Sequence, residues 1–592
     1  MENELNLEEI LPIGTEQVRQ AREVLHKYKA GKANLERKII ESEQWYKLRS
    51  WECMRREKHT NRAGDVEPVS GWLFNAIANK HADAMDNFPS PNVLPREASD
   101  KGEAESLSAI LPVILQQNDF EEVYDLASDD KLKSGTGVYG IFWDAGKLGG
   151  MGDITIRQED VLSLFWQPGI MDIQNSRHFF HVALMENEAL EQSYPHLAGR
   201  LGSSALDLSQ YMYDDTVDTS NMSAVVDWYY KKQVEGRTVL HYCKFVNDEV
   251  LFASENDPRY ALTGWYDHGM YPYVFDPLFR MKGTPCGFGY VDVAKSAQEY
   301  IDRGNQAILE NLLANAAPRH FIREDGEVNE GEYADTRKKF VHVGGNLGRD
   351  SIIPIEGKPL SSIYVDVVNH KIDELKEVTG NRDISTGGTS SGVTAASAIA
   401  AMQEAGSKLS RNANRASYRA FRKLCLMTIE LIRQFYDTPR CFRLLGEEKF
   451  LSYSNSGLQP QQQREAGMAM GMRMPLFDIE ITAQKQSPYS KLSQNELALQ
   501  LYNAGLLNPQ MADQALVCLE MMDFDRKEFL MQRIARNGTL SQRLAALEQA
   551  MGMAAQMPGK PLGKLNIPLE GQRKESYITR NARKRVAEST AP

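Results

Sequence analysis

Residues 408–423 constrain the fold more than any other part of this 592-residue chain. They include four arginines, two lysines and no acidic residue. The steps of three and four residues place five of these cations on one face of a helix. The cations are Lys408, Arg411, Arg415, Arg419, Arg422 and Lys423. The stretch therefore predicts a long helix with one cationic face.

Small and apolar residues form a second stripe at the same spacing: Leu409, Ala413, Ala416, Ala420, Leu424, Met427 and Leu431. Such a stripe predicts that the helix packs against the rest of the protein. The preceding segment, Thr379 to Thr394, reads TGNRDISTGGTSSGVT and is too polar for a core. We expect a polar loop that leads into a helix ending near Tyr436.

Three roles are open for the cationic face: a solvated surface, a contact with carboxylates of neighbouring subunits, or a contact with nucleic acid. Like charges four residues apart cost a helix a few tenths of a kcal/mol per pair, roughly, which favours an anionic partner. The net charge is −12 and the pI is about 5.6, so a general phosphate-binding surface is not expected. Any nucleic-acid contact is therefore expected to be local or weak.

Composition narrows the class of protein further. The length predicts several structural units. Six scattered cysteines without a CxxC pair predict reduced thiols, with no disulfide framework and no zinc site. The first residues lack the pattern of a signal peptide, and the longest near-apolar run, Val393 to Met402, is too short for a membrane span. We expect the protein to be synthesised in the cytoplasm and not to associate with a membrane.

The order of sequence patterns predicts an α+β fold. A β-rich body with mainly antiparallel strands is expected over residues 137–275. Helices are expected over residues 16–57, 71–87, 101–133, 289–316, 361–378 and 491–555. Residues 319–359 are short and mixed, with strands expected at 320–323, 340–343 and 351–355. Residues 444–484 are also mixed, and a basic tail follows residue 557.

No motif indicates an enzyme, a cofactor or a metal. GTGVYG, at Gly135 to Gly140, has the spacing of a dinucleotide loop, but a helix precedes it and a strand follows, which is the reverse of that motif. The chain has no GxxxxGK[ST] phosphate loop. His178 and His181 are expected on opposite faces of a strand. The pairs Asp129-Asp130 and Asp214-Asp215 are interpreted as solvated turns.

Several segments, in this order, resemble the portal proteins of tailed bacteriophages, the head-to-tail connectors. They are NFPSPNVLP, DKLKSGTGVYGIFWD, DVLSLFWQPG, GFGYVDVAKSAQEYIDRGNQAILENLLANAAPRHFI and VTGNRDISTGGTSSGVTAASAIAAMQEAGSKLSRNANRASYRAFRKL. The resemblance extends from about Trp72 to Ala555. It depends on the order and the residue character of these segments more than on an invariant motif. The basic tail has no counterpart in it.

The resemblance implies a ring subunit built from named regions. These are a wing at 1–282, a first stem helix at 283–317, a clip at 318–359, a second stem helix at 360–380, a tunnel loop at 381–394, a tunnel helix at 395–436, a wing return at 437–490, a helical crown at 491–556 and a flexible basic tail at 557–592. It further implies a ring of about twelve copies at one vertex of the virion capsid, through which double-stranded DNA is packaged and ejected. In such a ring, we favour contacts of the cationic helix with carboxylates of a neighbouring subunit over a direct grip on DNA.

The same resemblance nominates contact residues and partners. The loop residues expected to face DNA are Arg382, Asp383, Ser385, Thr386, Thr389, Ser390 and Ser391. The clip residues expected to meet partners are Arg337, Lys338, Lys339 and Arg349. The implied partners are the terminase large subunit, tail adaptor proteins, and the major capsid or scaffolding protein. Two alternatives stay open: another virion structural protein, and a metal-dependent enzyme acting on nucleic acid.

Overall fold

The computed structural model describes residues 12–55, 66–201, 220–234, 236–316, 320–322, 329–335, 338–342, 352–355, 360–381, 408–443, 450–465 and 468–485, and four isolated positions between 500 and 519. The chain divides into two compact units, Met1–Gln486 and Ser487–Pro592. In the second unit the four described positions are helical, and Leu519 is buried.

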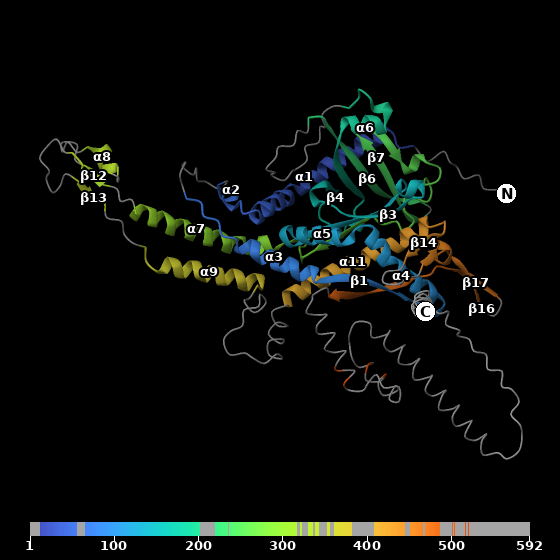
Figure 1. The fold of residues 1–592 in the computed structure, drawn as a ribbon. Coiled ribbons are helices and arrows are strands. Elements are labelled where there is room, and N and C mark those ends of the chain that lie inside the picture. Colours follow the sequence, from blue (N-terminus) through green and yellow to red (C-terminus); the bar gives the residue numbers. More distant parts are fainter. Residues whose placement is uncertain are drawn as a thin grey trace, which may run out of the picture. The chain divides into compact units, whose positions relative to one another are not determined.

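Helices and strands are mixed in the first unit, as the α+β prediction requires (Figure 1). The α-helices are α1 (Thr15–Tyr46), α2 (Ser50–Arg55), α3 (Trp72–Met85), α4 (Lys101–Gln117), α5 (Phe120–Ser134), α6 (Asn187–Ser193), α7 (Tyr290–Ala316), α8 (Glu330–Ala334), α9 (Ile363–Thr379) and α11 (Lys408–Phe435). The strands are β1 (Asn87–Pro95), β2 (Thr136–Asp144), β3 (Asp153–Gln158), β4 (Leu164–Trp166), β5 (His178–Glu186), β6 (Met222–Val234), β7 (Arg237–Val246), β8 (Glu249–Ala253), β9 (Tyr273–Pro277), β10 (Phe279–Arg280), β11 (Gly287–Phe288), β12 (His320–Ile322), β13 (Ile352–Pro354), β14 (Arg440–Arg443), β15 (Phe450–Tyr453), β16 (Gln461–Glu465), β17 (Met468–Arg473) and β18 (Phe477–Lys485).

Two of the expected N-terminal helices are each broken in two. The helix expected over 16–57 ends at Tyr46, and Leu48 then adopts a left-handed backbone with φ 59°. The helix expected over 101–133 is split into α4 and α5 at Asp119, whose φ is 48°. Side-chain periodicity continues across both breaks, so the sequence pattern did not reveal them.

The β-rich body consists of two antiparallel sheets, with strand orders β3-β2-β9 and β4-β5-β6-β7-β8. Alternate side chains of a strand point to opposite faces of a sheet. On β5, Phe179 contacts Tyr273 of the three-stranded sheet at a ring distance of 4.7 Å. Its neighbour Phe180 packs in the cluster that contains Val18 and Leu25 of α1. Helix α1 and the smaller sheet therefore cover opposite faces of the larger sheet.

The Pro-rich segment after α3 forms strand β1, which sequence analysis did not foresee, and it pairs antiparallel with β18 near residue 480. Pro89, Pro91 and Pro95 lie at alternate positions, so their missing N–H groups share one edge. Val93 belongs to the same alternating set of positions as these prolines. Its amide donates to Ser108 Oγ of α4 (2.8 Å) and not to β18. The prolines thus leave the β18 pairing intact.

Helices α7 and α9 lie side by side and antiparallel (Figure 1). Gly304 permits their close approach, because a Cβ there would lie 2.5 Å from Val368 Cγ2. Between them in sequence, β12 pairs with β13, and α8 is a single short helix. Residues 340–342 form no strand, contrary to expectation, and Val343 lies outside the described residues. In the β-rich body, strand β4 begins only at Leu164, because the Asp160 side chain accepts from the Leu162 amide and starts a 3-10 turn at Val161.

Candidate functional site

Helix α11 carries the cationic face that the sequence predicts. Arg411, Arg415, Arg419, Arg422 and Lys423 are all exposed. The opposite side is buried in the protein core and includes Ala416, Ala420, Leu424, Met427 and Leu431. The predicted apolar stripe is therefore confirmed at these positions, while the side chains of Lys408 and Leu409 lie outside the described residues.

Within this subunit, the cationic face forms an ion pair at Arg422. Arg422 lies 3.5 Å from Asp478 of β18, which also pairs with Arg96 at 2.9 Å. Such exposed pairs contribute about 0–1 kcal/mol each. Among the described residues, no carboxylate lies within 4 Å of Arg415, Arg419 or Lys423. These three side chains are therefore available to an anionic surface outside the described part of this subunit.

A buried ion pair beneath α11 was missed by the sequence analysis. Lys131 of α5 lies 2.9 Å from Asp276 of β9, and both side chains are almost fully buried. Its ammonium also donates to Ser417 Oγ (2.6 Å) and to the Ala413 carbonyl (3.1 Å) on α11. Burial lowers the pKa of Lys131, and the Asp276 carboxylate opposes that shift. The one available signal was a lysine within the apolar stripe of α5, four residues after Ala127.

A second buried lysine joins the ends of α9 and α11. Lys80 of α3 donates to Ser410 Oγ (3.0 Å) and to the Gly380 carbonyl (3.5 Å). Ser410 in turn donates to Asp83, one turn further along α3 (2.8 Å). Helix α3 thus contacts the chain on both sides of the expected loop. The nominated loop residues Arg382, Asp383, Ser385, Thr386, Thr389, Ser390 and Ser391 lie outside the described residues, as do 395–407 of the expected tunnel helix.

In the segment between α7 and α9, the nominated Lys338 pairs with Glu332 at 3.2 Å. Hydrogen bonds from the amide and side chain of His342, and from Lys338, lower the pKa of Glu332 to about 2. Lys339 is exposed, whereas Arg337 and Arg349 lie outside the described residues. The structure adds apolar side chains that the sequence analysis did not nominate, and Phe321 and Phe340 are 65% and 78% exposed.

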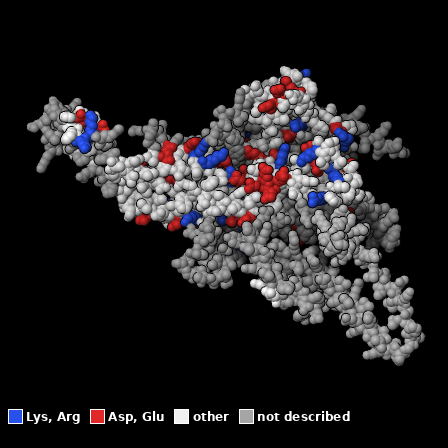
Figure 2. Space-filling view, viewed as in Figure 1, with Lys and Arg blue, Asp and Glu red and all other residues white. Residues whose placement is uncertain are grey.

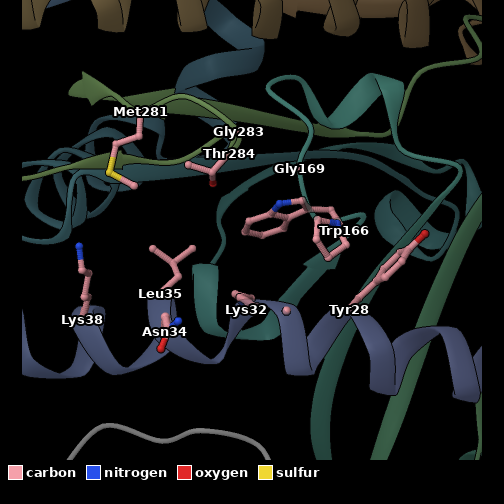
Figure 3. A pocket seen from close by; sticks show the side chains of 12 residues that line it. Tyr28, Lys32, Asn34, Leu35, Lys38, Trp166, Gly169, Met281, Gly283 and Thr284 are labelled. Atoms are coloured by element: carbon pink, nitrogen blue, oxygen red, sulfur yellow. The ribbon is translucent and has the colours of Figure 1, made fainter.

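A pocket of about 230 Å³ lies between α1, the end of β4 and the turn at Met281–Thr284 (Figure 3). Lys32 lines it, but its ammonium already donates to the carbonyls of Val161 (2.5 Å), Leu162 (3.3 Å) and Leu164 (2.7 Å). Burial lowers the pKa of Lys32 to about 8. Because its donors are used within the chain, Lys32 anchors α1 to the β-rich body.

The enzyme-like motifs have structural explanations. Gly135, with φ 97°, ends α5, and the glycines that follow enter strand β2, which is the helix-to-strand order expected. A Cβ on Gly137 would lie 2.2 Å from the Ala127 carbonyl, so this glycine allows helix and strand to touch. His178 and His181 do face opposite sides of the sheet: His178 stacks on Phe180 in the α1 cluster, and His181 lies 6.4 Å from Tyr273.

The interpretation of Asp129 and Asp130 as a solvated turn is wrong. Both lie within α5, where Asp129 pairs with Lys133 (2.6 Å) and Asp130 accepts from Gln158 (2.6 Å). Burial raises the pKa of Asp130 to about 7. Asp214 and Asp215 lie outside the described residues. Within the described ranges, no group of three His, Cys, Asp or Glu side chains is placed to hold a metal ion. The helices in these ranges also include none with the length and apolar character of a membrane span.

Comparison with known proteins identifies the family. The family described as Phage P22-like portal protein matches residues 81–269 and 237–567, which together cover well over half of the chain. No curated protein sequence matches. The match includes the β-rich body, the α7–α9 pair and the cationic helix α11. This chain belongs to the Phage P22-like portal protein family.

Proposed function

We propose that this portal protein assembles into a closed ring of about twelve copies, as is typical of the family, at one vertex of the capsid. The ring forms the channel through which double-stranded DNA is packaged and later ejected. The family match is the single observation that carries this proposal. The paired α7 and α9, with a small α/β segment between them in sequence, are consistent with a stem and clip.

The proposed regions keep their sequence-based boundaries. They are a wing at 1–282, stem helices at 283–317 and 360–380, a clip at 318–359, a tunnel loop at 381–394, a tunnel helix at 395–436, a wing return at 437–490, a crown at 491–556 and a basic tail at 557–592. Support comes from α7, α9 and α11, which lie within the proposed stem and tunnel helices, and from β14–β18, which lie within the wing return.

The net charge of the ring suits a channel through which DNA slides better than a site that binds DNA tightly. Twelve copies carry 12 × −12 = −144 formal charges. Each phosphate neutralised by Lys or Arg adds salt-dependent affinity, so a strongly basic channel would hold DNA in place. Polar loop residues such as Ser390 and Thr389 would face the moving DNA without such a grip.

The clip is the proposed docking platform for the terminase large subunit and for tail adaptor proteins. Lys338, Lys339, Arg337 and Arg349 remain the proposed polar contacts. The exposed Phe321 and Phe340 supply the apolar contacts, because aromatic anchors carry much of the energy of protein interfaces. The wing and crown would meet the major capsid or scaffolding protein, which places the protein in the virion.

A packaging assay tests this function. Proheads assembled with this protein should protect double-stranded DNA from nuclease when terminase and ATP are added. Phe321→Ser with Phe340→Ser should reduce the protected DNA at least tenfold while rings still form. Phe450→Ser, at a 75% exposed site on β15, is the matched control and should package normally. Equal packaging by proheads that lack the protein would refute the proposed function.

A further inference from the structure

The outer face of α5 is acidic. Glu121 and Glu122 are exposed, and among the described residues neither has a cation within 4 Å. Asp125 lies 3.0 Å from His81, and Asp129 pairs with Lys133, yet both carboxylates remain partly exposed. Figure 2 shows acidic side chains gathered over this helix. Leu126, 47% exposed, lies among them and adds an apolar spot.

The outer face of α11 is basic and points the opposite way. The inner faces of the two helices meet, since the rings of Phe120 and Phe421 lie 5.4 Å apart and Lys131 reaches Ser417. These two contacts also make the helices antiparallel. One subunit therefore presents an acidic helix face on one side of this layer and a basic helix face on the other.

The two faces have the same spacing. Glu121, Asp125 and Asp129 recur every four residues on α5, and Arg411, Arg415, Arg419 and Lys423 do so on α11. Four residues of α-helix rise about 6 Å. Two such rows, laid against each other, bring opposite charges into register along their length. Each row by itself places like charges next to one another, which costs helix stability.

We propose that the basic face of α11 in one subunit docks on the acidic face of α5 in the next copy of this chain. A contact between two different patches of the same chain is head-to-tail, and repeating it closes a ring when the rotation allows. The inference rests on the proposed ring and names the surfaces that join it. DNA contact with α11 would leave the matching acidic row on α5 without a role.

Two charge-reversed variants test the docking. Arg415→Glu with Arg419→Glu places two carboxylates in the middle of the basic row, and Glu121→Lys with Glu122→Lys places two ammonium groups at the start of the acidic face. We expect each variant alone to lose ring assembly in native mass spectrometry. Mixed one to one, the variants should form rings in which they alternate, because the new carboxylates of one variant then meet the new ammonium groups of the other, and the two unmodified faces meet as in the native contact. A ring of twelve has the even number that alternation requires.

Lys27→Glu with Arg237→Glu is the matched control for the arginine variant, since it makes the same charge change at exposed sites on other elements and should leave rings intact. Circular dichroism of each variant checks that the subunits fold. Normal rings from either variant alone, with or without weaker DNA retention, would overturn the proposed contact, and so would a mixture of folded variants that never assembles. Absence of rings in the unmodified protein would instead count against the proposed function.

Discussion

At the scale of single residues, two buried lysines hold helices to the β-rich body. Lys131 joins α5, β9 and α11, and Lys32 joins α1 to the turn before β4. Neither role could be predicted from the sequence, because a lysine in an apolar stripe is also expected to extend its ammonium to solvent. Whether each ammonium is buried or reaches solvent depends on where the fold places Asp276 and the carbonyls at β4. Both are far from these lysines in the sequence.

Removing Lys131 should destabilise the fold strongly. Lys131→Met leaves the Asp276 carboxylate buried without its cation, and breaking a buried pair in this way costs about 3–5 kcal/mol. Urea unfolding followed by tryptophan fluorescence should show the loss as a lower midpoint. Adding Asp276→Leu should recover much of it, since no charge then stays buried. Lys27→Met, at an exposed site on α1, is the control and should shift the midpoint little; an equally small shift for Lys131→Met would contradict the account.

Lys32 should make stability depend on pH. Its folded pKa is about 8 and its ordinary value is 10.5, so between these values the unfolded chain binds more protons. Raising the pH from 8 to about 10 therefore favours the folded state, and below pH 8 the slope from this group vanishes. Lys32→Met should remove this rise relative to the unmodified protein, in thermal melts at stepped pH, whereas Lys27→Met should retain it. Parallel pH profiles for both variants would exclude the role of Lys32.

At the scale of elements, much of the order of helices and strands could be predicted from the sequence. The α7, α9 and α11 helices and the β2–β7 strands follow from periodicity and β-branched runs. Strand β1 could not, because prolines argue against a strand and its partner β18 lies nearly 400 residues away. The breaks at Leu48 and Asp119 depend on left-handed backbone at residues that seldom adopt it. The nominated loop residues stay predictions.

The α7–α9 pair should be sensitive to one added methyl group. Gly304→Ala places a Cβ against the stiff, β-branched Val368, and overpacking typically costs about 1–3 kcal/mol, more than the ~1 kcal/mol gained in helix propensity. Hydrogen exchange of α9 peptides should accelerate. Val368→Ala in the same chain should relieve the clash. Gly102→Ala in α4, where nothing lies within 4 Å of the added carbon, should leave exchange unchanged. Unchanged exchange in Gly304→Ala would show that the helices can separate without cost.

At the scale of the whole molecule, charge links the fold to assembly. If opposite charges join neighbouring subunits, salt should weaken the ring, since the screening length falls from about 10 Å at 0.1 M to about 3 Å at 1 M. The ring fraction in sedimentation velocity should drop across this range. Arg415→Gln with Arg419→Gln should show a shallower dependence. Rings that are indifferent to salt would indicate an apolar interface instead.

The central claim is that this acidic chain closes into a ring with an axial channel. Native mass spectrometry of the purified protein, with negative-stain images of the same sample, tests it most directly. We predict a single assembly of about twelve 66.7 kDa subunits with a central hole. A monomer or dimer that never closes into rings, even at high concentration, would contradict it.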